Sequence, residues 1–172
     1  MVEILGHDEP IPGDAEPMGA PHRLRFRIGV EGRAGEVLAL LSTPSELPRL
    51  HPLIRTVAQT SVRKSGTLLC TDFSVEEDIP LLGGRCSVHN RYRGRVTVDV
   101  AQPLVARLSG WSVPGVRIEA RHRMSAPDEL EETLWFSAPL IVRPLVRQQL
   151  LHSHAKTLDA AVAVVCGRPL PK

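Results

Sequence analysis

Two residues that could do chemistry together, His122 and Glu132, lie on neighbouring predicted strands. Residues 116–124 and 129–138 each alternate apolar and polar side chains, which is the period of a β-strand. On each strand the titratable residue shares its face with apolar neighbours. If residues 126–128 form a three-residue loop, the hairpin register puts His122 opposite Glu132, with Cβ atoms about 5 Å apart.

An imidazole beside a carboxylate has three uses, and the sequence leaves all three open. The carboxylate would hold His122 in one tautomer and raise the pKa of its ring. Such a histidine is suited to act as a general base. The same pair could anchor the carbonyl or hydroxyl group of a ligand, or it could be a satisfied polar pair near the open end of the sheet.

Further candidates lie on the other predicted strands. Asn90 and Tyr92 share the apolar face of the long strand 85–100, and Phe73 lies on strand 67–79. We expect all three to line the same concave surface as His122, because alternate residues of a strand point to one face. An amide and a phenol among apolar residues are typical of a ligand site.

The position of Arg107 and Trp111, on strand 104–111, depends on the length of the loop around Pro114-Gly115. A loop of two or four residues places Arg107 beside His122, where it would bind an anion, and Trp111 beside Ile118. A loop of three residues turns Arg107 outward, because a one-residue shift exchanges the faces of a strand.

The last predicted element is a helix over residues 144–166, about 35 Å long. Its apolar stripe includes Leu151 and Ala155, and we expect Gln148 on the same sheet-facing side. His152 and His154 are two positions apart and do not share a helical face, so we expect no metal site there and no cofactor. His51, before Pro52, is expected to cap or pack at a corner, with the cavity rim as its second role.

Composition indicates a globular protein of one domain. The chain has 172 residues, of which 42% are hydrophobic and 23% charged. The longest apolar run, residues 160–166, is far below the ~20 residues that span a bilayer. The N-terminus has no pattern of a secretory signal, and three cysteines without C-x-x-C spacing form no disulfide framework, which fits a reducing cytoplasm.

The order of elements indicates an α+β domain at residues 21–167. Residues 1–20 contain five acids and no Lys or Arg and are predicted to be a disordered acidic tail, and residues 168–172 form a short C-terminal tail. Strand 22–31 is followed by two short helices at 34–41 and 45–50. The remaining strands, with no crossover helix between them, form an antiparallel meander: 54–63, 67–79, 85–100, 104–111, 116–124 and 129–138.

This order resembles the helix-grip fold of the START-like (SRPBCC) superfamily, particularly its polyketide cyclase/dehydrase and lipid-transport group. The resemblance covers residues 21–166 and is carried by the opening strand, the helix 34–41, the segment Leu50-His51-Pro52-Leu53-Ile54 and the passage from strand 130–136 into the last helix. It implies a seven-stranded antiparallel curved sheet wrapped around the long C-terminal helix. It also implies an apolar cavity between them for a hydrophobic ligand.

The sequence is compatible with three functions. The first is binding or transport of a small hydrophobic molecule such as a lipid, an isoprenoid or a polyketide-like aromatic. The second is a cyclase or dehydratase in which His122 is the base, Glu132 orients it, and Tyr92 or Asn90 steadies the oxyanion. The third is an interaction module that uses a basic outer sheet face, since residues 21–172 carry 21 bases and 14 acids. That face lacks the interleaved aromatics of nucleic-acid-binding sheets, and a monomer and a homodimer both stay open.

Overall fold

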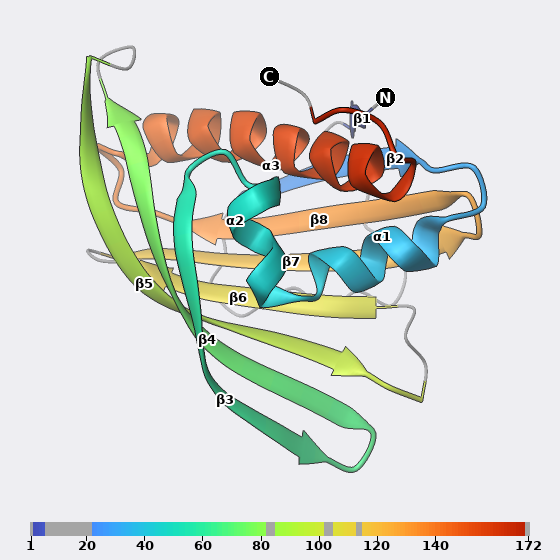
Figure 1. Cartoon of the computed structure of the whole chain (residues 1–172). Helices are drawn as coiled ribbons and strands as arrows, with labels where there is room; N and C mark the ends of the chain where they lie inside the picture. Colours follow the sequence, from blue (N-terminus) through green and yellow to red (C-terminus); the bar gives the residue numbers. More distant parts are fainter. Residues whose placement is uncertain (1, 6–21, 82–84, 102–104, 113–114, 171–172) are drawn as a thin grey trace.

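A single antiparallel sheet of eight strands carries one long helix across its concave side (Figure 1). The computed structural model describes residues 2–5, 22–81, 85–101, 105–112 and 115–170. The strand order is β1-β2-β8-β7-β6-β5-β4-β3. The strands are β1 (Val2–Leu5), β2 (His22–Gly29), β3 (Ile54–Ser65), β4 (Leu68–Leu81), β5 (Cys86–Asp99), β6 (Val105–Ser112), β7 (Val116–Ala126) and β8 (Glu129–Ser137).

The described residues also form four helical segments. They are α1 (Ala34–Leu41), the 3-10 turn η1 (Pro44–Glu46), α2 (Leu47–Leu50) and α3 (Arg143–Val165). Helix α3 ends where the sequence predicts, because Gly167 adopts a φ of 66°, which L side chains rarely adopt. The predicted α+β architecture, with two short helical segments after β2 and a long C-terminal helix, is confirmed.

The sheet has one strand more than predicted. The prediction of a disordered tail over residues 1–20 is wrong for Val2–Leu5. This segment is β1, an edge strand that pairs antiparallel with β2, with Val2 opposite Ile28 and Leu5 opposite Arg25. Val2 packs against the main core from this position. A four-residue strand held by a distant partner has too few residues for alternation to be detected. Residues 6–21, the rest of the predicted tail, lie outside the described residues.

The interior is divided into two apolar clusters. The larger joins α1 and α3 to β2, β7 and β8, and includes Phe26, Leu134 and Leu158. The smaller joins α2 to β3, β4 and β5, around Phe73 and Val75. One helix cannot cover both halves of a curved sheet, so space remains between the two clusters.

The strands β4 and β5 form the curved half of the sheet and rise past the N-terminal end of α3 (Figure 1). Their close packing depends on Gly94, because a Cβ built there would lie 2.5 Å from Cζ of Phe73. The absence of a side chain at Gly94 therefore lets the Phe73 ring pack closely against β5, where it is 2% exposed.

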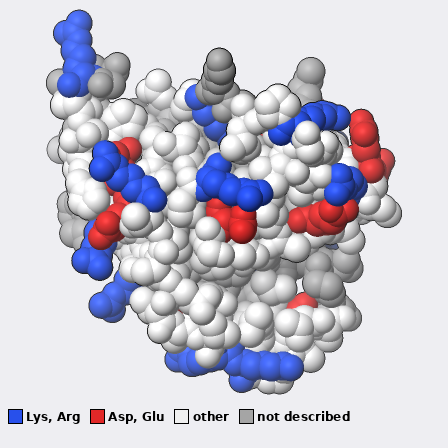
Figure 2. Space-filling view, viewed as in Figure 1, with Lys and Arg blue, Asp and Glu red and all other residues white. Residues whose placement is uncertain are grey.

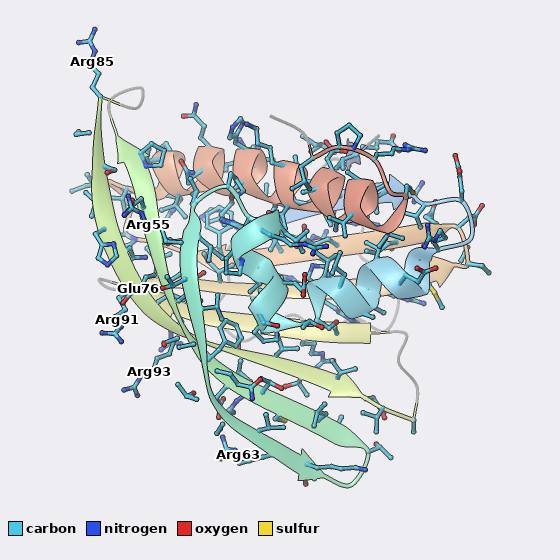
Figure 3. All side chains as sticks on the ribbon, in the orientation of Figure 1. Arg55, Arg63, Glu76, Arg85, Arg91 and Arg93 are labelled. Carbon is cyan, nitrogen blue, oxygen red and sulfur yellow. The ribbon has the colours of Figure 1, made fainter. Side chains whose placement is uncertain are left out.

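The outer face of the sheet carries the arginines, as the alternation predicts. Arg91 and Arg93 point away from α3 on the outer side of β5 (Figure 3). On the opposite side of the molecule, which carries the helices, several Lys or Arg side chains also have an acidic neighbour (Figure 2). Cross-strand ion pairs partly neutralise the outer face of the sheet: Arg91–Glu76 (3.7 Å), Arg95–Asp72 (2.6 Å) and Arg27–Glu131 (3.2 Å). Ion pairs that are exposed to solvent in this way contribute little to the stability of the fold.

Candidate functional site

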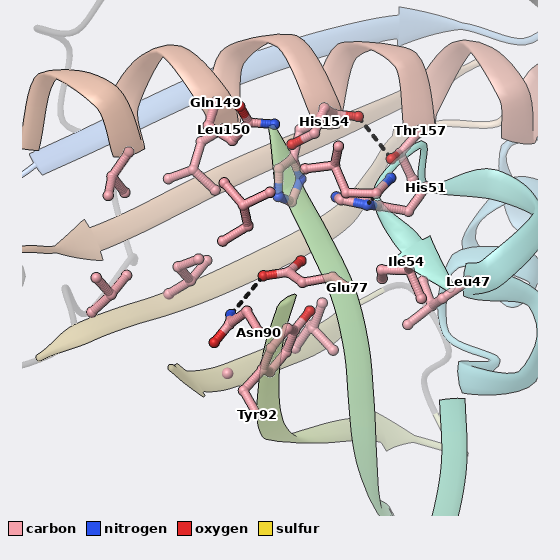
Figure 4. Close-up of a pocket in the computed structure, with 18 of the residues that line it drawn as sticks. Leu47, His51, Ile54, Glu77, Asn90, Tyr92, Gln149, Leu150, His154 and Thr157 are labelled. Carbon is pink, nitrogen blue, oxygen red and sulfur yellow. Dashed lines mark hydrogen bonds between the residues drawn. The ribbon is translucent and has the colours of Figure 1, made fainter. Parts of the chain in front are cut away.

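A cavity of about 560 Å³ lies between the sheet and α3, between the two apolar clusters. Its walls come from β4–β8, the α2 corner and the inner side of α3, and most of the lining is apolar. Aliphatic residues such as Leu47, Ile54 and Leu150 form this part of the wall, and polar side chains stand among them (Figure 4). A cavity of this size and composition is typical of sites for small apolar molecules.

The predicted contact between His122 and Glu132 is confirmed. The two residues face each other in the β7–β8 register, and His122 Nε2 lies 3.0 Å from Glu132 Oε1. The loop itself differs from the prediction, because Ala126 pairs directly with Glu129 and the extra residue forms a bulge between Met124 and Ala126. The bulge preserves the register that a three-residue loop would have given.

His154 on α3 is a third member of this group. Its Nδ1 lies 2.9 Å from the same Oε1 of Glu132, so one carboxylate oxygen accepts hydrogen bonds from two imidazoles. The ring of His154 stacks on Phe26, with centroids 6.4 Å apart. Because β7, β8 and α3 each contribute one residue, the cluster His122–Glu132–His154 joins the sheet to the helix.

Glu132 is held as a carboxylate although it is only 2% exposed. Burial by itself would raise its pKa, but His154 and His122 outweigh this effect and hold the pKa of Glu132 well below its usual value. An ionised carboxylate only accepts hydrogen bonds, so both histidines donate to it. A neutral His122 then keeps its lone pair on Nδ1, and a neutral His154 keeps it on Nε2. The second oxygen, Oε2, is buried and makes no hydrogen bond with any residue the structure describes.

His51 lies next to this cluster, at the corner between α2 and β3. Its Nδ1 accepts a hydrogen bond from the Leu53 N–H (3.3 Å), and its ring meets His154 edge-on with centroids 5.9 Å apart. The ring also lines the cavity. Burial, and then repulsion from His154, lower the pKa of His51 to about 3. The ring is therefore neutral at pH 7, and its hydrogen is on Nε2.

A second polar group lies on the β4–β5 wall. Asn90 Nδ2 donates to Glu77 Oε1 at 2.8 Å, and Tyr92 follows on the same face of β5 (Figure 4). Burial raises the pKa of Glu77, and the hydrogen bond from Asn90 only partly opposes this. Burial, and then the nearby Glu77, also raise the pKa of Tyr92, so its phenol keeps its proton at neutral pH.

Five of the ten predicted ligand-site residues line the cavity: Phe73, Asn90, Tyr92, His122 and Glu132. Of the two alternatives for β6, the structure has the three-residue connection that turns Arg107 outward, so the predicted ligand contact of Arg107 is wrong. The side chain of Trp111 lies outside the described part of the structure. The β6–β7 connection leaves three residues between Ser112 and Val116, so Ala106 faces His122 and Arg107 faces Arg121. Arg107 is exposed. Trp111 stands opposite Arg117 in the register instead of Ile118.

The three residues predicted on α3 are also wrong. Gln148 is exposed, and Leu151 and Ala155 pack against the larger core cluster outside the cavity wall. The helix is rotated relative to the predicted stripe, so it presents Gln149, Leu150, Ser153, His154 and Thr157 to the cavity. Because four of these five residues are polar, the apolar pattern did not reveal the side of the helix that faces the cavity.

Sequence reasoning also missed Glu77 and the pairing of His154 with Glu132. Glu77 could have been found from the alternation of β4, in which Phe73, Val75, Glu77 and Ile79 share one face. His154 lies four residues from both Leu150 and Leu158, which are buried, and this helical spacing was available in the sequence.

Two negative findings apply to the residues that the structure describes. Within these residues, no group of three or more His, Cys, Asp or Glu side chains is arranged to hold a metal ion. None of the helices in the described segments is long and apolar enough to cross a membrane.

Solved structures share this architecture. The chain superposes on the Zhui aromatase/cyclase of a Streptomyces strain with a TM-score of 0.62 and 13% identity, covering 83% of this chain and 92% of that one. A START superfamily protein from Mycobacterium smegmatis gives 0.58 and 16%, with coverages of 84% and 99%. A STAR-related lipid transfer protein from Xanthomonas axonopodis gives 0.58 and 12%, with coverages of 91% and 97%.

The chain has the START-like helix-grip fold. No protein-family model and no curated protein match the sequence, so the likeness is one of structure. At identities of 12–16% it establishes the fold alone. What the chain binds must therefore be argued from its own cavity.

Proposed function

We propose that this protein binds a small hydrophobic molecule in the cavity between its sheet and α3. The observation that carries the proposal is a cavity of about 560 Å³ whose mainly apolar wall holds the His122–Glu132–His154 cluster. The apolar wall supplies affinity through burial, and the cluster fixes the orientation of one polar group on the ligand. The similar structures include an aromatase/cyclase and a lipid transfer protein, which supports this class of ligand.

The rim of the cavity supports the proposal. Ile141, which is 94% exposed, lies with Val142 and Leu145 at the start of α3, and all three also line the cavity. Exposed apolar side chains that are grouped together often mark a binding site. At this position they give a hydrophobic molecule a continuous apolar path from the surface to the interior.

A pair of neighbouring glutamines provides a matched test. Gln149 lines the cavity, whereas Gln148 is exposed on the same helix. Gln149→Trp fills part of the cavity and is expected to weaken binding of the uncharged dye Nile red about tenfold or more. Gln148→Trp is expected to leave binding within about twofold. Fluorescence titration measures both, and equal affinities for the two variants would place the dye outside the cavity.

The two histidines that share Glu132 favour proton transfer as a second function, as in a cyclase or dehydratase. In the proposed step, Nδ1 of His122 takes the proton from a carbon next to the ligand carbonyl, and the C–H electron pair forms an enolate. The Nε2–H of His122 stays on Glu132 Oε1 (3.0 Å), which stabilises the imidazolium. The phenol of Tyr92 donates to the developing oxyanion.

This second function predicts exchange of hydrogen for deuterium at an activated carbon. The methyl group of 2-acetylnaphthalene in deuterated buffer, followed by NMR, is expected to exchange at least tenfold faster with wild-type protein than with His122→Gln. Tyr92→Phe is expected to slow exchange without abolishing dye binding. If exchange with the wild-type protein is no faster than in buffer alone, the protein has no proton-transfer activity towards this ketone and the second function is refuted.

A further inference from the structure

The charges of the cavity indicate which ligands it accepts. Among the described residues that line it, none is Lys or Arg, although the chain has 21 of these residues. Two carboxyl groups, Glu77 and Glu132, do line it. A ligand with a carboxylate or phosphate would meet these acids with no permanent cation to pair with, in a site where burial strengthens the repulsion.

The two carboxyl groups of the cavity leave hydrogen-bond acceptors available to a ligand. Glu132 Oε2 is buried without a partner among the described residues. On the facing wall, Glu77 receives one hydrogen bond, from Asn90, and the rest of its carboxyl group points into the space between β4 and α3 (Figure 4). A buried acceptor without a donor costs about 1–3 kcal/mol, so a ligand that brings a donor gains affinity here.

We propose that Glu77 is a specificity-determining residue that selects an uncharged apolar ligand carrying a hydroxyl group, such as an alcohol or phenol, and rejects anions. The inference rests on the proposed binding function. The ligand hydroxyl donates to Glu77, and its apolar body lies between Tyr92 and Leu150. The His122–Glu132–His154 cluster then meets a second polar group, if the ligand has one, across the cavity.

Three naphthalenes of similar shape test the inference by displacing Nile red at pH 7. The phenol 2-naphthol is uncharged and donates a hydrogen bond, 2-methoxynaphthalene cannot donate, and 2-naphthoate is an anion. Wild-type protein is expected to bind 2-naphthol about tenfold more tightly than either of the other two. Equal affinities for all three, or tighter binding of 2-naphthoate, would overturn the role of Glu77 while leaving the binding function standing.

Variants of two adjacent glutamates assign the selectivity to one residue. Glu77→Leu is expected to reduce the preference for 2-naphthol over 2-methoxynaphthalene to about twofold, with dye affinity kept. Glu77→Gln retains an acceptor oxygen and is expected to keep most of that preference, which covers the case in which the leucine variant fails to fold. Glu76→Leu, on the outer face beside Arg91, is the control and is expected to change nothing. If folded Glu77→Leu still prefers 2-naphthol over 2-methoxynaphthalene as strongly as wild type does, the inference is refuted. If the wild-type protein does not bind Nile red at all, the proposed binding function itself is refuted.

Discussion

Replacing both His122 and His154 with leucine is expected to lower the free energy of unfolding at pH 7 by about 3–5 kcal/mol. The double change leaves the carboxylate of Glu132 buried without either hydrogen-bond donor. Adding Glu132→Leu should recover most of the lost stability, because three leucines at these positions leave no buried charge to desolvate. Urea unfolding measures all three proteins, and a triple variant less stable than the double variant would contradict this account.

The pH dependence gives the same prediction a second test. In wild type the pKa of Glu132 is depressed, so its contribution to stability is present above the unfolded value of about 4.3 and is lost only as the pH falls below it. In the double variant burial raises that pKa, and the folded protein gains a proton more readily than the unfolded chain. The difference in the free energy of unfolding between wild type and the double variant should therefore be largest at pH 7 and should become smaller towards pH 4.

His51 is expected to make the fold sensitive to acid. Its pKa is lowered to about 3, so the unfolded chain takes up a proton near pH 6.5 while the folded chain does not. Stability is therefore lost as the pH falls from about 6.5 towards 3. Between pH 7 and pH 4 this histidine should account for about 3 kcal/mol of lost stability.

The comparison of His51→Gln with wild type isolates this effect. The variant should lose about 3 kcal/mol less stability than wild type between pH 7 and pH 4, measured by urea unfolding at the two pH values. His152→Gln, exposed on α3, is the matched control and should follow wild type. Parallel pH profiles for wild type and His51→Gln would show that the ring is protonated in the folded state.

The strands and the His122–Glu132 pair could be predicted because they depend on local patterns. Alternation of period two fixes which residues share a face, and a short hairpin then fixes which residues face each other. The same reasoning left the position of Arg107 open, because the Pro114-Gly115 connection could have either parity. The connection has three residues between Ser112 and Val116, and this length turns Arg107 outward. The length follows from the pairing of Ser112 with Val116, which the sequence alone does not give.

The helix wall could not be predicted because its cavity side is partly polar. Ser153, His154 and Thr157 face inward, whereas the apolar Leu151 and Ala155 pack beside the cavity. A hydrophobic stripe locates the side of a helix that packs, and here the side that faces the cavity departs from it. The place of His154 in the cavity wall is therefore seen most clearly in its contact with Glu132, which is a tertiary contact.

Methyl NMR of the folded protein during a titration with 2-naphthol shows directly whether a ligand binds between the sheet and α3. Saturable one-to-one shifts are expected at Ile54, Ile118 and Leu150, which line the cavity. Val62 and Leu68, which are exposed at the far end of β3 and β4, should not move. Shifts that fail to saturate, or that are equally large at Val62 and Leu68, would contradict a ligand site between the sheet and α3.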